Sequence, residues 1–209
     1  MMFGIGVVGH VARQSMAEQL ASTTEADYLS LDDGRLGPGA NHCLVWSRLA
    51  TLNHEWTVVL EDDALPVAGF RDQLSQALGA EPASVVSLYL GQQRPPQHQV
   101  MIANALAEAE ACQAHWITST YLLHAVAVAI KTELVPDMLA NLPALPIDEA
   151  IGDWARSRGH QIAYSVPSLV DHADLPTLVN HPDGQPRQTG RVAWQVGGRT
   201  HWNGFSVAL

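Results

Sequence analysis

The chain has 209 residues, of which 47% are hydrophobic and 15% charged, a composition typical of one ordinary globular domain. Its 21 acidic residues exceed its 11 basic ones, so the net charge is −10 with histidine neutral. Proteins that grip a phosphate backbone need a basic surface, so this excess of acid argues against tight non-specific binding of nucleic acid. No apolar run approaches the ~20 residues of a membrane span.

The N-terminal residues and the two cysteines both bear on the cellular compartment of the protein. The start, "MMFGIGVVGH", lacks the basic region of a secretory signal and is expected to be the first strand of the fold. Cys43 and Cys112 show no metal-binding spacing, which predicts free thiols in a reducing compartment. We therefore expect a cytoplasmic protein.

Apolar runs that predict strands alternate with amphipathic segments that predict helices. Strands are expected at residues 3–8, 27–31, 57–61, 84–90, 115–124 and 161–165. Helices are expected at residues 12–23, 42–52, 68–78, 101–111, 135–141 and 148–158, with Asn41 as the N-cap of the second. Residues 125–130 are ambiguous between a strand and a helix, and a helix is favoured. From Val166 onward the chain is rich in Pro, Gly and His and is expected to be irregular. This alternation predicts an α/β fold with a mostly parallel central sheet flanked by helices.

Three acidic residues, Glu61, Asp62 and Asp63, directly follow the apolar run "TVVL". Ligands of such folds bind beyond the carboxyl ends of the strands, which is where these carboxylates fall. Because side chains alternate along an extended chain, we expect Glu61 and Asp63 to share a cation, with Asp62 on the other side. Mg²⁺ or Mn²⁺ suits such oxygen ligands. Solvated acids at a strand end, or a cap on the next helix, are the alternative.

Two later segments, "PIDEAIGDW" and "PSLVDHADLP", supply possible partners for these acids. Asp148 and Glu149 lie at the start of a predicted helix, where the helix dipole favours acidic residues. A capping role and a catalytic role are therefore equally compatible with their position. His172 follows Asp171, and an imidazole beside a carboxylate can bind Mn²⁺. An ordinary surface histidine is the alternative for His172.

The exit of the first strand also carries polar residues. His10 and Arg13 lie where they could contact a phosphate or a base, although a role at the start of the following helix is equally compatible with their position.

Several of these segments resemble one known family. "VVLEDDALPVAGF" resembles the LEDD segment of the glycosyltransferase family that includes the lipopolysaccharide and collagen galactosyltransferases. The upstream "GPGANHCLVWSRLATLNHEW" resembles that family's helix before the acidic strand, and "PIDEAI" resembles its later acidic motif. "PSLVDHADLPTLV" and "GRVAW" look most like small glycosyltransferase-like proteins of actinobacteria and their phages. The resemblance covers about residues 3–202.

The resemblance implies a transferase of the GT-A type in a single Rossmann-like domain, residues 1–209. Residues 1–100 would form the half that binds the nucleotide-sugar, and residues 101–209 the acceptor and catalytic half with an irregular tail. By the same resemblance, Glu61–Asp63 replaces the usual Asp-x-Asp signature, Asp63 is a ligand of Mn²⁺ or Mg²⁺, and His172 takes the place of the carboxy-terminal metal-binding histidine.

The resemblance also assigns the donor site. Gly9, His10 and Arg13 at the exit of the first strand, with Asp32 and Asp33 at the exit of the second, would hold the nucleoside. Glu61 and Asp62 would complete the site for the nucleotide-sugar, for which a UDP-sugar is favoured.

The expected chemistry is sugar transfer from a nucleotide-diphosphate-sugar, with a divalent ion neutralising the departing diphosphate. Inversion is expected by analogy with the family, and a carboxylate must then accept the acceptor's proton. Asp148 is the first candidate for this base and Glu149 the second; one of the two would only orient the sugar or cap the helix.

Other assignments remain open from the sequence. The acceptor is a glycan, a protein or a modified nucleobase, in a bacterial or phage-infected cell. A nucleotidyltransferase or another metal–phosphate enzyme would use the same acidic strand end. A non-catalytic module that binds nucleotide-sugars is the third possibility.

Overall fold

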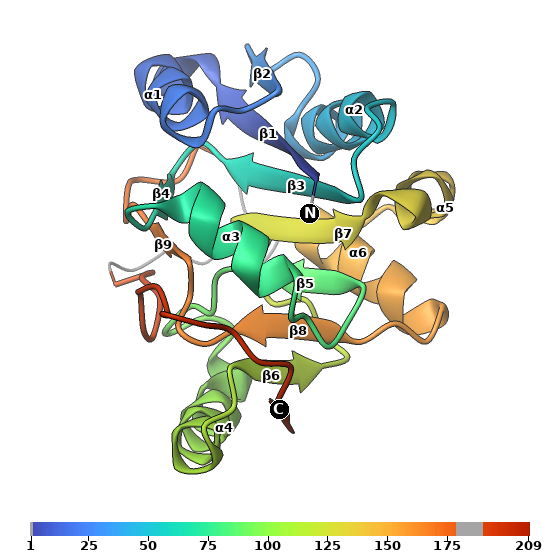
Figure 1. Ribbon diagram of the computed structural model, residues 1–209. Coiled ribbons are helices and arrows are strands. Elements are labelled where there is room, and N and C mark those ends of the chain that lie inside the picture. Colours follow the sequence, from blue (N-terminus) through green and yellow to red (C-terminus); the bar gives the residue numbers. More distant parts are fainter. Residues whose placement is uncertain (1, 179–189) are drawn as a thin grey trace.

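The computed structural model describes residues 2–178 and 190–209, and its centre is one eight-stranded sheet (Figure 1). The strands of this sheet are β1 (Phe3–His10), β2 (Tyr28–Asp32), β3 (Trp56–Glu61), β5 (Val85–Ser87), β6 (Trp116–Ser119), β7 (Ala127–Lys131), β8 (Ile162–Ser165) and β10 (Ser206–Ala208). Their order across the sheet is β10-β6-β8-β5-β7-β3-β1-β2. The predicted α/β fold with a Rossmann-like sheet is confirmed.

The strand directions bring the carboxyl ends of several strands to one edge of the sheet. β1 is parallel to β2 and β3, and β5 is parallel to β8, whereas β7 is antiparallel to both of its neighbours, β3 and β5. The strands β1, β2, β3, β5 and β8 therefore all end at the same edge. At the other end of the sheet, β6 is antiparallel to β8 and parallel to β10.

Helices cover both faces of the sheet (Figure 1). The helices are α1 (Gln14–Thr24), α2 (Pro38–Ala50), α3 (Phe70–Leu78), α4 (Gln99–Cys112), α5 (Val135–Asn141) and α6 (Ile147–Ser157), and short 3-10 turns precede α1, α4 and α5. α1 and α3 bury their apolar residues on one face, and α2, α4, α5 and α6 bury theirs on the other. Because both faces are covered, β3 is buried along its whole length up to Glu61 and is apolar there except at Thr57.

The prediction of a helix at residues 125–130 is wrong. This segment forms β7, which lies between β3 and β5 and is buried from Ala127 to Ile130. A strand buried on both faces is apolar at every position, so its periodicity does not distinguish it from a buried helix.

The N-cap role predicted for Asn41 is also wrong, because α2 begins at Pro38, with Gly37 as its N-cap in a left-handed backbone conformation (φ 79°). Proline suits the first turn of a helix because its missing N–H would lack a partner there. Asn41 instead points inward, where its amide donates to the carbonyl of Gly9 (3.0 Å) and accepts from the Ser30 hydroxyl (2.6 Å).

The late part of the chain is more regular than expected. Val170–His172 forms β9, which pairs antiparallel with β4 (Ala64–Pro66), and Ser206–Ala208 forms the edge strand β10. Short strands of three residues carry too little pattern to be predicted from sequence. Residues 179–189, including His181, lie outside the described residues.

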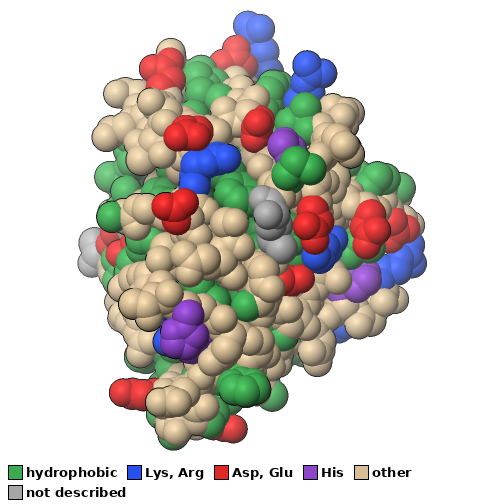
Figure 2. Space-filling view, viewed as in Figure 1, with side chains coloured by type: hydrophobic (Ala, Val, Ile, Leu, Met, Phe, Trp, Pro, Cys, Tyr) green, Lys and Arg blue, Asp and Glu red, His purple; other side chains and the backbone are tan. Residues whose placement is uncertain are grey.

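Two surface properties bear on partners. Among the described residues, no helix combines the length and the apolar character that crossing a membrane requires. On the face shown in Figure 2, acidic and basic side chains lie scattered, without a continuous basic area among the residues that are described.

Cys43 and Cys112 are free cysteines that form no disulfide.

Candidate functional site

The carboxyl ends of β1 and β2 bring most of the predicted donor-site residues together. Register pairs His10 with Asp32 across these strands, and Gly9 precedes His10. A Cβ atom on Gly9 would lie 2.9 Å from both Ala17 Cβ and Leu31 Cδ2, so only glycine lets α1 and β2 pack this closely.

Asp32 and Asp33 organise the loop that follows β2. The two carboxylate oxygens of Asp32 accept from the backbone N–H groups of Leu36 (3.0 Å) and Gly37 (2.8 Å), and these bonds, led by the one from Leu36, lower the pKa of Asp32. Asp33 is more exposed and pairs with the guanidinium of Arg35 at 3.3 Å. Asp32 therefore shapes the loop, and Asp33 lies on its open side.

Asp62 and Asp63 share one guanidinium. Arg13 Nη1 donates to Asp62 Oδ1 (3.0 Å) and to Asp63 Oδ2 (2.6 Å), and the backbone N–H of His10 donates to Asp62 Oδ2 (2.9 Å). Both aspartates are buried. The exit of β1 and the exit of β3 are thus joined by a charged contact that satisfies two adjacent carboxylates.

His172, on the late strand β9, lies next to Asp63. β4 and β9 pair so that Ala64 lies opposite His172, next to Asp63 (Figure 1). His172 Nε2 is 3.3 Å from Asp63 Oδ2, and the backbone N–H of Ala173 donates to the carbonyl of Asp63 (2.8 Å). The structure therefore brings together Asp63 and His172, the two residues that the resemblance assigns as metal ligands.

The two aspartates differ in proton affinity. Burial would raise the pKa of Asp63, but the contacts with His172 and the charge of Arg13 outweigh it and hold that pKa below its ordinary value. Burial prevails at Asp62, whose pKa is raised despite the hydrogen bonds from His10 and Arg13. Of these two aspartates, Asp63 is therefore the one that stays ionised more readily, as a ligand of a metal cation requires.

Glu61 does not join Asp63, contrary to the expected alternation. The chain turns at residues 62 and 63, so the extended geometry ends at Glu61. Glu61 Oε1 contacts the Nε2 atom of buried His42 at 3.2 Å, whereas Asp62 and Asp63 share Arg13. The expected placement of Asp62 on the side opposite Asp63 is wrong for this reason, because both aspartates contact Arg13.

Asp148 and Glu149 lie in the first turn of α6. Asp148 Oδ1 accepts from the backbone N–H of Glu149 at 2.9 Å. Burial, reinforced by the nearby charge of Glu61 and opposed by that hydrogen bond, raises the pKa of Asp148 to about 6. A carboxylate with a pKa near neutrality suits proton transfer, while Glu149 is exposed.

Two aromatic residues beside His172 were not predicted as site residues. The buried Tyr89 ring lies 6.0 Å from the ring of His172 and 5.1 Å from that of His124, measured between centroids. Burial, and next to it the charge of His172, lowers the pKa of His124 to about 4, so this imidazole is neutral at neutral pH. No motif marks either residue; the position of Tyr89 near the end of the strand predicted at residues 84–90 was the only available signal.

Asp63 and His172 supply one carboxylate and one imidazole, ligand types that suit a divalent ion. Asp63 Oδ1 and His172 Nδ1 are buried and lack a hydrogen-bond partner among the described residues. A carboxylate and an imidazole suit Mn²⁺, and Mg²⁺ commonly takes few protein ligands together with phosphate oxygens and water. In the described part of the chain, no group of three or more His, Cys, Asp or Glu side chains could hold a metal ion, so an ion held by these two residues would need further ligands from substrate or water.

No family model matches the chain, and no curated protein matches it. Among solved structures, the crystal structure of A197 from STIV is similar, with a TM-score of 0.49 and 11% sequence identity over 96% of this chain and 99% of that chain.

The raised pKa of Asp148 predicts a pH-dependent stability. The native state binds this proton more tightly than the unfolded state, so the charged carboxylate costs stability as pH rises from about 4 through about 6. Asp148→Asn is therefore expected to raise the free energy of unfolding by about 1–3 kcal/mol at pH 7.5, with the gain vanishing below about pH 4. Urea denaturation at both pH values measures this, with Glu149→Gln as the exposed control. A gain that does not change with pH would contradict the assignment.

Removal of the Arg13 guanidinium, which Asp62 and Asp63 share, is expected to destabilise the native state. Arg13→Gln leaves Asp62 and Asp63 buried without their cation and is expected to lower the free energy of unfolding by about 3 kcal/mol. The matched variant Arg35→Gln removes a guanidinium that is 89% exposed and should change it by less than about 0.5 kcal/mol. Equal effects of the two substitutions in urea denaturation would show that the contact of Arg13 is not structural.

Proposed function

We propose that this protein is a metal-dependent glycosyltransferase of the GT-A type, which moves a sugar from a nucleotide-diphosphate-sugar to an acceptor with inversion. The observation that carries the proposal is the contact between Asp63 and His172 at the carboxyl edge of the sheet. These residues are 109 positions apart in the sequence, and the pairing of β4 with β9 joins them. An ionised carboxylate and an imidazole at this edge are a fitting pair for a cation that binds a diphosphate.

Different residues of the chain would bind different parts of the donor. Asp63 and His172 would hold Mn²⁺ or Mg²⁺, which when bound neutralises the charge that develops on the departing diphosphate. Arg13 keeps Asp62 and Asp63 fixed and adds a positive charge at the same edge. The exits of β1 and β2, with His10 and the loop shaped by Asp32, would hold the nucleoside, for which we propose uridine.

Asp148 is the proposed base. Its pKa of about 6 leaves it mainly ionised at neutral pH while keeping useful affinity for a proton. It lies within the electrostatic influence of Glu61, two residues before Asp63, so it belongs to the same end of β3. Glu149 supplies the backbone N–H that orients the Asp148 carboxylate. We propose a glycan, a protein or a modified nucleobase as the acceptor, met in the cytoplasm of a bacterial or phage-infected cell.

The contacts of Arg13 favour a second candidate, a nucleotide-sugar-binding module that needs no metal. One guanidinium already satisfies an oxygen of both Asp62 and Asp63, so the acids have a partner without an ion. Such a module would bind a UDP-sugar equally well with and without Mn²⁺ and would release no UDP.

Ligand-dependent stabilisation tests the proposal. A ligand of the native state at a hundred times its Kd adds about 2.7 kcal/mol to the free energy of unfolding. A UDP-sugar is therefore expected to raise the melting temperature in the presence of Mn²⁺ and much less in its absence. Asp63→Asn and His172→Gln should abolish the manganese-dependent part, because each removes a proposed ligand.

Asp72→Asn is the matched control, since Asp72 is an exposed acid in the first turn of α3. It should respond to the UDP-sugar and Mn²⁺ as the unaltered protein does. A manganese-dependent shift that survives both Asp63→Asn and His172→Gln would refute the metal assignment, and a shift independent of Mn²⁺ would favour the binding module.

A further inference from the structure

A pocket of about 380 Å³ lies between the last turns of α4 and the late segment at residues 195–203. Both flank β6 near the end of the sheet opposite to β2 (Figure 1). Leu106, Ala109 and Val166 line the pocket and are buried, so they form an apolar floor. Polar and charged side chains line the rest of it. The pocket therefore suits a ligand that has both an apolar and a polar part.

Contacts between residues far apart in the sequence fix the walls of this pocket. The backbone N–H of Asn203 donates to Nδ1 of buried His115 (2.9 Å), and its side-chain amide donates to the carbonyl of Gln113 (3.2 Å). The Nε atom of Arg199 donates to the carbonyl of Val166 (2.6 Å). The chain itself therefore holds both walls in place, and a ligand can bind without the cost of ordering them.

Arg199 carries a positive charge that no carboxylate balances. Among the described residues, no Asp or Glu side chain forms an ion pair with it, and its guanidinium lies 5.9 Å from the centroid of the Trp202 ring. Burial lowers the pKa of Arg199 without an opposing acid, whereas Asp62 and Asp63 outweigh the burial of Arg13 and raise its pKa. A half-buried guanidinium without a counterion is a favourable partner for a carboxylate.

Glu110 supplies the opposite charge to the same pocket. It is exposed in the last turn of α4, and among the described residues it forms no ion pair, neither with Arg199 nor with another base. His115 is neutral at neutral pH, because burial, followed by the charge of Arg199, lowers its pKa. Two unpaired charges of opposite sign therefore line one pocket.

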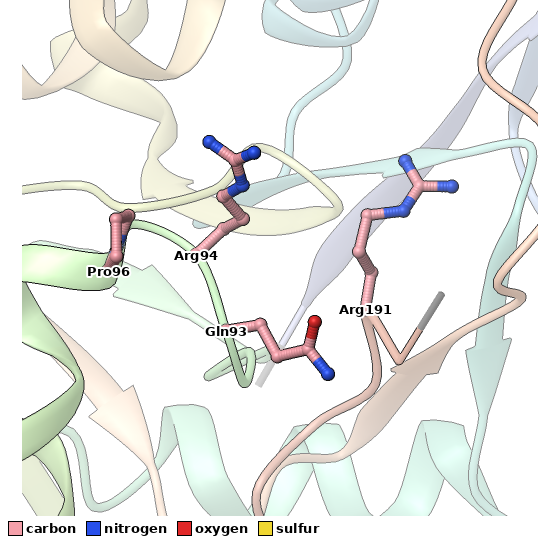
Figure 3. A pocket seen from close by; sticks show the side chains of 4 residues that line it. All are labelled: Gln93, Arg94, Pro96 and Arg191. Atoms are coloured by element: carbon pink, nitrogen blue, oxygen red, sulfur yellow. The ribbon is translucent and has the colours of Figure 1, made fainter. Parts of the chain in front are cut away.

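Another pocket, of about 290 Å³, lacks this property. It is lined by Gln93, Arg94, Pro96 and Arg191, and in Figure 3 the side chains of the two arginines extend in the same direction. Both arginines have partners, since Arg191 Nε pairs with Asp174 Oδ1 at 3.2 Å and Arg94 is engaged as well. A charged ligand is therefore better placed in the pocket that contains Arg199.

We propose that this pocket binds a free α-amino acid with an apolar side chain. The guanidinium of Arg199 binds the carboxylate, Glu110 binds the ammonium group, and the apolar floor takes the side chain. A ligand that carries both charges satisfies both side chains, whereas a simple anion or cation leaves one of them unpaired.

This site is distinct from the candidate site at Asp63. Val166, on the pocket floor, follows β8, and β5 and β7 separate β8 from β3. Three strand spacings correspond to about 14 Å. The inference therefore goes beyond the proposed function and does not depend on it.

Calorimetric titration of the full chain at pH 7 with three probes tests this assignment. L-leucine carries both charges, 4-methylpentanoate lacks the ammonium group, and L-leucinamide lacks the carboxylate. L-leucine is expected to bind about tenfold more tightly than either of the other two, because a lost charge-assisted hydrogen bond weakens binding by about that factor.

Two substitutions identify the side chains that bind each charge. Arg199→Gln should weaken the binding of L-leucine by about tenfold and leave that of L-leucinamide nearly unchanged. Glu110→Gln should weaken L-leucine likewise and leave 4-methylpentanoate nearly unchanged, and because Glu110 is exposed this variant keeps its fold. Glu108→Gln, exposed on the same helix, and Arg48→Gln, exposed at the end of α2, are the matched controls outside the pocket. Circular dichroism checks that each variant is folded.

The outcomes separate this inference from the proposed function. Absence of L-leucine binding at millimolar concentration, or binding that neither Arg199→Gln nor Glu110→Gln weakens, overturns the amino-acid site. If 4-methylpentanoate binds as tightly as L-leucine, the ligand is a simple anion and the assignment of Glu110 is wrong. UDP with Mn²⁺ should bind equally to the unaltered protein and to both variants. L-leucine binding that depends on Arg199 and Glu110 in a protein that binds no UDP supports this site and contradicts only the proposed function.

Discussion

The pairing of β4 with β9 is the contact on which the candidate site depends. These two short strands lie outside the main sheet, and their register places His172 beside Asp63. Asp171, on the same strand, accepts from the backbone N–H groups of His172 and Ala193, both at 2.8 Å. The same strand therefore fixes the imidazole next to the carboxylate and holds the segment that carries Arg191.

Charge is arranged in order along the carboxyl edge of the sheet. Asp32 closes a loop after β2, Arg13 joins the exits of β1 and β3, and Asp63 meets His172. Beyond Tyr89, the guanidinium of Arg191 pairs with Asp174. Although the protein is acidic, each buried carboxylate at this edge is paired with a specific hydrogen-bond donor. The net charge of the chain does not reveal this local pattern.

The sequence was most informative where patterns are long. The apolar run ending at Glu61 predicted both β3 and the position of Asp63 at the functional edge, and the acids of "PIDEAI" predicted the start of α6. Three-residue strands such as β4 and β9 carry no comparable signal, so the contact of His172 with Asp63 came from resemblance alone. The roles of Glu61 and Arg13 depend on the turn at residues 62 and 63, a tertiary detail that alternation along a strand cannot supply.

The most direct test of the central claim is the anomalous scattering of manganese in crystals grown with Mn²⁺ and UDP. The account predicts an anomalous peak within coordination distance of both Asp63 and His172, with the diphosphate on the open side of the ion and the uridine toward β1 and β2. A peak at another place, or UDP bound away from this edge with no metal beside Asp63, would contradict it.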